Sequence, residues 1–248
     1  MTSAVYQTPV TLSPSRISNF RTCPLQFRFA SIEKLPQPPQ IHLVKGNFVH
    51  RVLELLLGNE PEHRTVEAAR QAFDKTRAEY EPSARFKALG LSPDASEAFF
   101  KDSRELVNGY YRMENPRNAK IIGLELRLDS DFGKFKLGGI IDRLEYNEKN
   151  ELVVSDYKTG KVPDARFGAN KMDNMHIYAS LCLRERGELP KRLRLMYLKS
   201  STPIEVEVTL ESNAACESAA IETFNQIDAS CQSGQFATKK SGLCNFCA

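Results

Sequence analysis

The pattern of hydrophobic and polar positions divides the chain into helical and strand-like regions. Apolar residues recur at helical spacing from Asn47 to Leu57, and a charged helical pattern with short breaks continues from residue 61 to about residue 115. From residue 120 to residue 160 the pattern changes to an alternation of period two, which predicts strands. The strands that we expect there are Ile121–Leu128, Phe132–Leu137, Ile140–Tyr146 and Leu152–Tyr157.

Further elements are expected on both sides of this strand region. Ser13 followed by Pro14 predicts the start of a helix, with serine as the N-cap and proline at the first helical position. After the strand region, we expect helices at Asn174–Arg186 and Ala214–Ser230 and strands at Leu193–Leu198 and Ile204–Leu210. Helices on both sides of a small mixed sheet predict an α/β or α+β domain.

The predicted elements form a single domain over residues 1–248. Its expected parts are N-terminal helices at 11–60, a helical insertion at 61–118, a core at 119–212 and a C-terminal helix and cysteine segment at 213–248. A chain of 248 residues is long enough to bury a sizeable core.

Composition narrows the class of protein. A hydrophobic content of 41% and a charged content of 26% are ordinary for a globular chain, and the net charge of +3 neither requires nor excludes a nucleic-acid partner. No apolar run has the length of a membrane span, and the N-terminus lacks a secretory pattern, so we expect a cytoplasmic protein without a membrane partner. Its six cysteines are then buried residues or metal ligands rather than disulfides. The absence of a Gly-x-x-x-x-Gly-Lys-Ser/Thr motif excludes a nucleotide-driven motor within this chain.

Two acids and a lysine stand out in the strand region. A turn centred on Lys149 sets Asp142 opposite Asp156, and Lys158 projects from the same face as Asp156. The same register pairs Leu144 with Val154 and Tyr146 with Leu152. Directly opposed Cβ atoms lie roughly 5 Å apart, and two like charges at that distance destabilise a hairpin unless a cation lies between them. The alternative is a surface hairpin with solvated charges.

This arrangement suits hydrolysis of a phosphodiester by a divalent metal ion. Carboxylate oxygens are the ligands that Mg²⁺ and Mn²⁺ prefer, so Asp142 and Asp156 are candidate ligands. The backbone carbonyl of Tyr157 lies between Asp156 and Lys158 in the sequence and is a third candidate. Lys158 would orient the attacking water or offset charge that develops on the phosphate.

Other polar residues are weaker candidates. His50 lies on the predicted helix with Glu54 one turn later, and imidazole suits Mn²⁺, although a histidine in an amphipathic helix is usually a boundary or surface residue. Glu125 either faces the same cleft or is exposed by alternation. Asn174 and Tyr178 are one helical turn apart and would contact a phosphate or stack on a base, with core and surface positions equally open.

The cysteines form a second constellation. Cys244-Asn245-Phe246-Cys247 is a C-x-x-C motif that fits zinc, iron–sulfur or redox chemistry. Redox chemistry is disfavoured because no thioredoxin-like strand–helix context surrounds the motif. Four thiolates make a closed site, and Cys23 and Cys231 are the available extra ligands.

Taken together, these segments resemble the RecB-type branch of the PD-(D/E)XK nuclease superfamily. The resemblance is greatest to the CRISPR-associated RecB-like exonucleases with an iron–sulfur cluster and to the AddB nuclease domain. It rests on segments that occur in the family's order: Leu12–Arg16 through Cys23-Pro24, Gly46–His50, Gly139–Arg143, Asp156–Gly160, Tyr178 and Cys244-x-x-Cys247.

The resemblance implies a restriction-endonuclease-like core, with a central mixed sheet flanked by helices. It implies that His50, Asp142 and Asp156 bind the metal ion and that Lys158 is catalytic. It also implies exonuclease activity on single-stranded DNA ends, in DNA repair, recombination or a CRISPR or phage setting in a prokaryotic or phage-encoded system. A helicase or a CRISPR adaptation protein is the partner that it implies.

The resemblance further implies a [4Fe–4S] cluster held by Cys23, Cys244 and Cys247, which ties the two ends of the chain together. Two departures from the family pattern matter. Asn174 stands where the family usually has glutamine, and its side chain is one methylene shorter. The fourth cysteine is expected several residues after the C-x-x-C motif. We expect that the sequence is truncated before it, and the alternatives are that Cys231 substitutes or that the cluster is incomplete.

Two other functions remain open from the sequence. One is a catalytically degenerate iron–sulfur module that binds DNA, which only Asn174 favours. The other is a nuclease subunit of a helicase–nuclease complex, which the missing nucleotide-binding loop allows.

Overall fold

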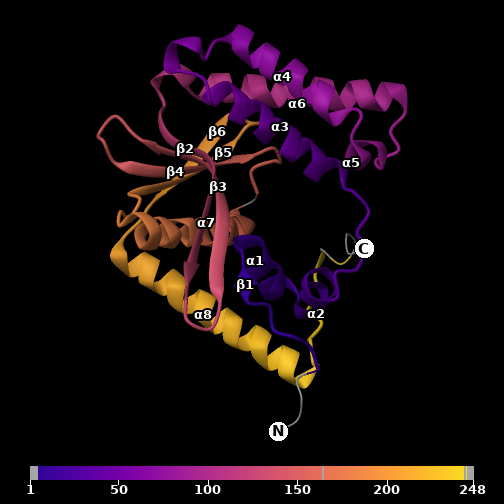
Figure 1. Ribbon diagram of the computed structural model, residues 1–248, viewed down its shortest axis with the longest axis vertical. Coiled ribbons are helices and arrows are strands. Elements are labelled where there is room, and N and C mark those ends of the chain that lie inside the picture. Colours follow the sequence, from indigo (N-terminus) through magenta and orange to yellow (C-terminus); the bar gives the residue numbers. More distant parts are fainter. Residues whose placement is uncertain (1–4, 164, 243, 245–248) are drawn as a thin grey trace.

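A computed structural model describes residues 5–163, 165–242 and 244 of the chain (Figure 1). Within these residues the core is one mixed sheet of six strands, in which β3 is central. The strands are β1 (Thr11–Leu12), β2 (Lys120–Asp131), β3 (Lys136–Tyr146), β4 (Leu152–Lys158), β5 (Arg192–Tyr197) and β6 (Thr202–Glu207). The prediction of a mixed α/β sheet flanked by helices is confirmed.

The topology leaves the middle of β3 open along one edge. Strand β2 runs antiparallel to β3 along its whole length. On the other edge, β1 pairs with β3 only at Lys136 and Leu137, and β4 pairs with it only from Arg143 to Tyr146. The segment of β3 between these two ladders has no strand partner on that side among the described strands. The candidate functional site, which includes Asp142 of β3, lies at this opening.

The predicted register of β3 and β4 is confirmed over most of the hairpin. Leu144 pairs with Val154 and Tyr146 pairs with Leu152, as the turn at Lys149 requires. The ladder ends at the next residues, so the expected pair of Asp142 and Asp156 is not part of it. The two strands separate there because the carboxylate of Asp142 accepts a hydrogen bond from the backbone N–H of Tyr157 at 2.7 Å.

One predicted strand is wrong. The apolar segment Phe132–Leu137 contains a turn, in which Gly133 adopts a positive φ of 84°, and β3 then begins at Lys136 and continues to Tyr146. The apolar residue at position 135 is explained by packing rather than by a strand, because the ring of Phe135 stacks on that of Phe224 with a centroid distance of 4.5 Å. Packing against a distant helix is not visible in a local alternation.

Helices cover both faces of the sheet (Figure 1). On one face α7 packs against apolar side chains of β3, β4 and β5, and α8 packs against α7. On the other face lie α3 and the inserted helices α4 and α6. The main helices are α1 (Pro14–Thr22), α2 (Pro24–Phe27), α3 (Ile41–Leu57), α4 (Val66–Tyr80), α5 (Ala84–Lys87), α6 (Pro93–Met113), α7 (Ala165–Arg186) and α8 (Leu210–Ser233). In the part of the chain that the structure describes, no helix is long and apolar enough to cross a membrane.

Several helices begin earlier than the sequence predicts. Helix α3 begins at Ile41 and contains Gly46, whereas the prediction began at Asn47. Helix α8 begins at Leu210 because Thr209 and Ser212 form a reciprocal capping box, so β6 ends before the predicted boundary. The predicted N-cap at Ser13 is confirmed, since its side chain accepts a hydrogen bond from the backbone N–H of Arg16.

A buried ionic network attaches the inserted helices to the sheet. Arg143 of β3 is fully buried and forms a two-point ion pair with Glu114, which directly follows α6. The same guanidinium donates to Glu145 at 2.7 Å and to the hydroxyl of Tyr110 at 3.1 Å. Arg194 of β5 lies 3.3 Å from the same oxygen of Glu145. Opposite charges therefore join β3, β5 and the end of α6.

The C-terminal segment returns to the N-terminal helices. The backbone N–H of Leu25 donates to the carbonyl of Ala237 at 3.2 Å, and the ammonium of Lys239 donates to the carbonyl of Arg21 at 3.1 Å. Tyr6 also donates its N–H to the carbonyl of Cys231 at 3.0 Å. These contacts bring residues near both ends of the chain together (Figure 1).

Candidate active site

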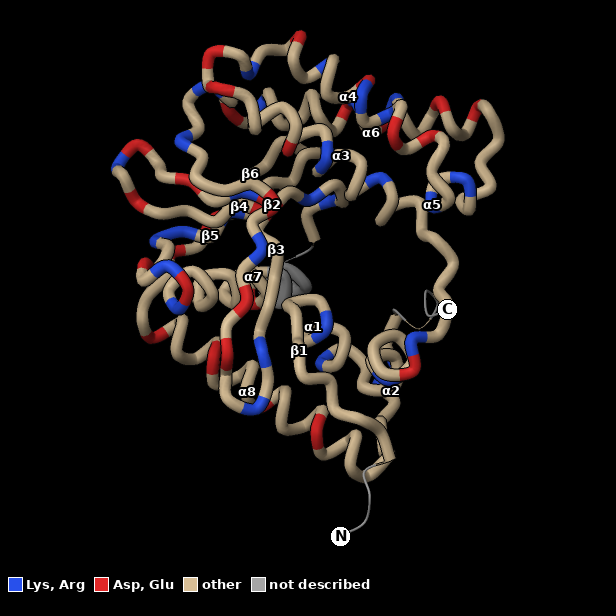
Figure 2. Tube along the Cα trace, in the orientation of Figure 1, with Lys and Arg blue, Asp and Glu red and all other residues tan. Residues whose placement is uncertain are grey.

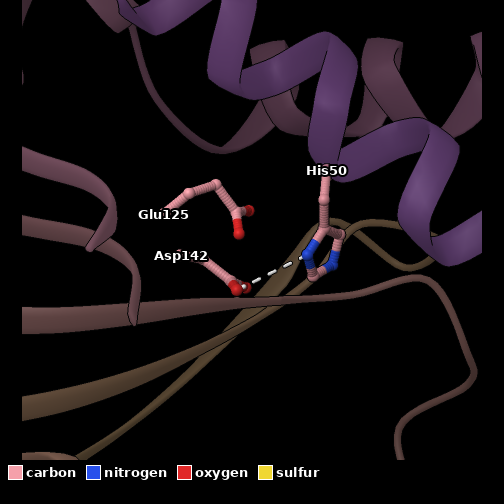
Figure 3. Close-up of side chains that lie close together, drawn as sticks. All are labelled: His50, Glu125 and Asp142. Atoms are coloured by element: carbon pink, nitrogen blue, oxygen red, sulfur yellow. Dashed lines mark ion pairs between the residues drawn. The ribbon is translucent and has the colours of Figure 1, made fainter. Parts of the chain in front are cut away.

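Three potential metal ligands meet beside the open edge of β3. His50 comes from α3, Glu125 from β2 and Asp142 from β3, and one ligand atom from each lies within 4.8 Å of the others (Figure 3). We refer to these three residues as the acid group, because two of them are carboxylic acids. They are half-buried, so the group is sheltered from solvent but open to a ligand. The sequence left open whether Glu125 faces the same cleft as the other two residues or is exposed.

The backbone of Tyr157 holds two of these side chains. Nε2 of His50 lies 3.0 Å from the carbonyl oxygen of Tyr157, and Nδ1 lies 3.5 Å from Oδ1 of Asp142. The N–H of Tyr157 donates to Oδ2 of Asp142. The carbonyl that the sequence proposed as a metal ligand therefore faces His50 in this structure. Tyr157 orients both side chains through its main chain.

Glu125 reaches the acid group because its backbone is irregular. Its φ is 44°, which is unusual for a residue with a side chain and costs roughly 1–3 kcal/mol. On either side of it, Leu124 packs with the α3 side of the sheet and Leu126 with the α7 side. The chain thus changes face at Glu125, which leaves its carboxylate toward α3.

Asp156 and Lys158 form an ion pair next to the acid group. Asp156 is 8% exposed, and it is not one of the three residues whose ligand atoms meet within 4.8 Å. Burial raises the pKa of Asp156, and the negative charge of Asp142 raises it further. The structure therefore confirms that Asp156 and Lys158 project together, and it places them beside the acid group rather than in it.

The negative charges of the site help to raise the pKa values of Glu125 and His50, which means that a positive charge would be stabilised there. Burial and the charge of Asp142 raise the pKa of Glu125 to about 6. Burial lowers the pKa of His50, but its hydrogen bond to Asp142 and the charges of Asp142, Asp156 and Glu125 outweigh that effect and raise the pKa to about 9. Without a cation, the His50 ring thus carries the proton that partly neutralises the carboxylates.

The donor set fits a divalent cation. Two carboxylates and an imidazole suit Mn²⁺ or Mg²⁺, with a preference for Mn²⁺ because of the nitrogen. A histidine that binds a metal ion commonly donates its other N–H to a backbone carbonyl, which is how Nε2 of His50 faces Tyr157. Nδ1 then remains for a cation beside Asp142.

Tyr178 lies close to the acids, whereas Asn174 has no described contact with them. The ring of Tyr178 packs on Gly139, where an added Cβ atom would lie 2.6 Å from Cε1. Burial raises the pKa of Tyr178, and the charges of Asp156 and Asp142 add to this effect. Asn174 is half-buried one turn earlier on α7, and within the described residues no hydrogen bond links it to the acid group.

The predicted cluster cysteines are only partly described. Cys23 lies between α1 and α2 beside Lys239, while Cys244 is exposed and Cys247 lies outside the described residues. Burial raises the pKa of Cys23, but backbone hydrogen bonds from Gln26 and its neighbours together with the charge of Lys239 lower it overall. Cys231 is fully buried among apolar side chains, which disfavours it as a cluster ligand.

The family follows from a comparison with known proteins. A family model described as the PD-(D/E)XK nuclease superfamily matches residues 11–248. The chain belongs to this superfamily. Its nucleases use divalent metal ions, in agreement with the donor set of the acid group. A comparison with curated protein sequences gives no match.

Two solved structures resemble the fold of this PD-(D/E)XK protein. A crystal structure from Eubacterium rectale with a provisional exonuclease name is 11% identical, with a TM-score of 0.56, and the match covers 97% of this chain and 93% of that one. The crystal structure of SSO0001 is 15% identical, with a TM-score of 0.46, and the match covers 97% and 84% of the two chains. The first likeness supports the restriction-endonuclease-like arrangement of sheet and helices.

Sequence reasoning missed two contributions to the site. The main-chain groups of Tyr157 leave no signal in the sequence, because any residue supplies them. Arg143 does leave one, since a charged residue in an otherwise apolar strand needs a buried partner. That partner, Glu114, lies 29 positions away and is identified only in the folded chain.

Proposed function

We propose that this PD-(D/E)XK protein is a divalent-metal-dependent deoxyribonuclease that removes nucleotides from single-stranded DNA ends. The observation that carries this proposal is the meeting of His50, Glu125 and Asp142 beside the ion pair of Asp156 and Lys158. Carboxylates this close to one another repel a DNA phosphate unless a cation is present. A DNA-binding module without chemistry has no use for such a group.

Each residue has a proposed role. His50, Glu125 and Asp142 would hold the metal ion, with Asp156 as a further ligand. A divalent ion held there would supply an activated water and relieve negative charge on the phosphate. Lys158 offsets charge that develops on the scissile phosphate and keeps Asp156 ionised. Tyr157 positions Asp142 and His50, and Tyr178 and Asn174 face the DNA from α7.

The RecB-type branch and its iron–sulfur cluster are part of the proposal. The C-terminal segment already packs on α1 and α2, and Lys239 lies beside Cys23. A cluster held by Cys23, Cys244 and Cys247 would strengthen this connection. Iron analysis and the visible absorption of anaerobically purified protein test the cluster separately from the nuclease. The cluster would be contradicted if the purified protein contains no iron and its Tm equals that of a Cys23→Ser variant.

End-labelled single-stranded DNA tests the nuclease directly. The wild-type protein is incubated with Mg²⁺, Mn²⁺ or a chelator, beside Asp142→Asn, Lys158→Met and the surface control Lys149→Ala. We expect metal-dependent shortening from the end, which both site variants lose by a factor of 10² or more and the control retains. A circular strand of the same sequence should resist.

Two outcomes would contradict the proposal. Binding without cleavage in either metal would favour the catalytically degenerate DNA-binding module. Cleavage of the circular strand at the rate of the linear one would make the protein an endonuclease.

A further inference from the structure

A groove lies along β3 between the start of α1 and Ile140, two residues before Asp142 of the acid group. Its volume is about 540 Å³, and its walls come from Thr11–Arg16 on one side and from β2 and β3 on the other. Tyr178 and Ile140 line the end of the groove nearest the acid group. The groove occupies the place where β3 has no strand partner, between the ladders with β1 and β4.

The basic residues that β2 and β3 contribute to the groove share one face of the sheet with the acid group. Gly139 and Ile141 of β3 contact α7, so the residues between and beside them face the opposite way. Lys136, Gly138, Ile140 and Asp142 therefore follow one another along that face at steps of roughly 6.7 Å. On β2, Arg127 pairs across from Ile140 and projects from the same face. A ligand laid along this face passes from the basic residues to the acids.

The basic residues of the groove are available to a ligand. Arg127 and Lys136 are exposed, and neither side chain forms a hydrogen bond or ion pair with any residue that the structure describes. Arg16 is half-buried, and one of its N–H groups donates to the carbonyl of Thr11 at 2.9 Å. One carboxylate, that of Asp129, shares the groove with these three cations. Figure 2 shows basic positions on both β3 and α1.

Two glycines, Gly138 and Gly139, lie among the β3 residues that line the groove. Gly138 lies opposite Asp129 on β2, and an added Cβ atom there would lie 3.3 Å from the Cβ atom of Asp129. A residue without a side chain lets an extended ligand approach the β3 backbone closely.

We propose that this groove is a second phosphate-binding subsite, which holds single-stranded DNA a few nucleotides away from the acid group. Arg127 and Lys136 bind phosphates through their charge, and Arg16 supports them from α1. The proposal rests on the nuclease function proposed above. It explains how a site built around carboxylates retains a polyanion, because the attraction acts beside the acids and not at them.

Binding measurements test the subsite without requiring cleavage. Fluorescence anisotropy of a labelled single-stranded oligonucleotide is measured in chelator over a range of salt concentrations. The double variant Arg127→Ala/Lys136→Ala is compared with Lys75→Ala/Lys149→Ala, which removes the same charge from exposed positions elsewhere. The charge-preserving variant Arg127→Lys/Lys136→Arg serves as the rescue.

The expected effect follows from counterion release. Two phosphate contacts to a single strand reduce the salt slope by about 1.4 and the affinity by roughly 25-fold at 0.1 M salt. The control variant should keep the wild-type slope, and the charge-preserving variant should restore most of the affinity. Because both residues are exposed, the variants should keep the wild-type Tm.

The outcomes separate this proposal from the nuclease proposal. Wild-type affinity and slope in the groove variant would overturn the subsite, even if the protein cleaves DNA. An equal loss in the control variant would also overturn it, since the effect would then be one of overall charge. Loss in the groove variant alone, in a protein that fails to cleave, would retain the subsite and reject the nuclease.

Discussion

Replacement of Arg143 tests whether the ionic network holds the inserted helices on the sheet. Arg143→Met keeps an unbranched side chain of similar length in a position with no exposure to solvent. The change removes the partner of Glu145, whose side chain is 6% exposed, and of Glu114, whose side chain is 21% exposed. Two carboxylates then remain in a region of low solvent access.

The magnitude follows from that burial. Removing one partner of a buried ion pair costs about 3–5 kcal/mol. Arg194 lies 3.3 Å from Glu145 and 3.7 Å from Glu114, so it compensates part of the loss, and we expect the lower end of that range. With about 2.1 cal/mol/K of unfolding entropy per residue, 3 kcal/mol lowers Tm by about 6 °C in this chain.

Thermal unfolding followed by circular dichroism or calorimetry measures the change. The double variant Arg143→Met/Glu145→Gln should be less destabilised than the sum of its two single variants, because it removes an uncompensated charge. Arg70→Ala breaks an ion pair on the exposed surface of α4 and should leave Tm unchanged. A change in Tm below 2 °C for Arg143→Met, or strict additivity in the double variant, would refute the reasoning.

Three further predictions concern the site. Gly139→Ala should destabilise the protein by about 1–3 kcal/mol, because the added methyl group would lie 2.6 Å from the Tyr178 ring; in a Tyr178→Ala background the same change should have little further effect in a denaturant titration. Mn²⁺ at about 100 times its Kd should raise Tm by roughly 5 °C, and the same concentration should leave the Tm of Asp142→Asn almost unchanged. In metal-free protein, the pKa of His50 is raised to about 9, so its protonated ring stabilises the fold fully below pH 6.5 and this contribution is lost as the pH rises toward 9. The loss is on the order of 3 kcal/mol, and a His50→Gln variant with the same pH dependence of unfolding would contradict the assignment.

The local features of this protein were accessible from its sequence. The N-cap at Ser13, the helical insertion and the register of the β3–β4 hairpin each depend on residues close together in the chain. Capping, periodicity and turn position are local properties, so a single sequence carries them. The proximity of Asp156 and Lys158 also follows from their spacing of two along one strand.

Only the tertiary structure decided how the acids are grouped. Alternation alone left open whether Glu125 faces the site, and the positive φ that turns it toward His50 leaves no local signature. The stretch of β3 between its ladders with β1 and β4 opens both the site and the groove, and one of these ladders joins strands that are more than 120 positions apart, because Leu12 of β1 pairs with Leu137 of β3. Metal ligands and phosphate-binding cations act through distance in space, and that distance is set by the packing of the whole sheet.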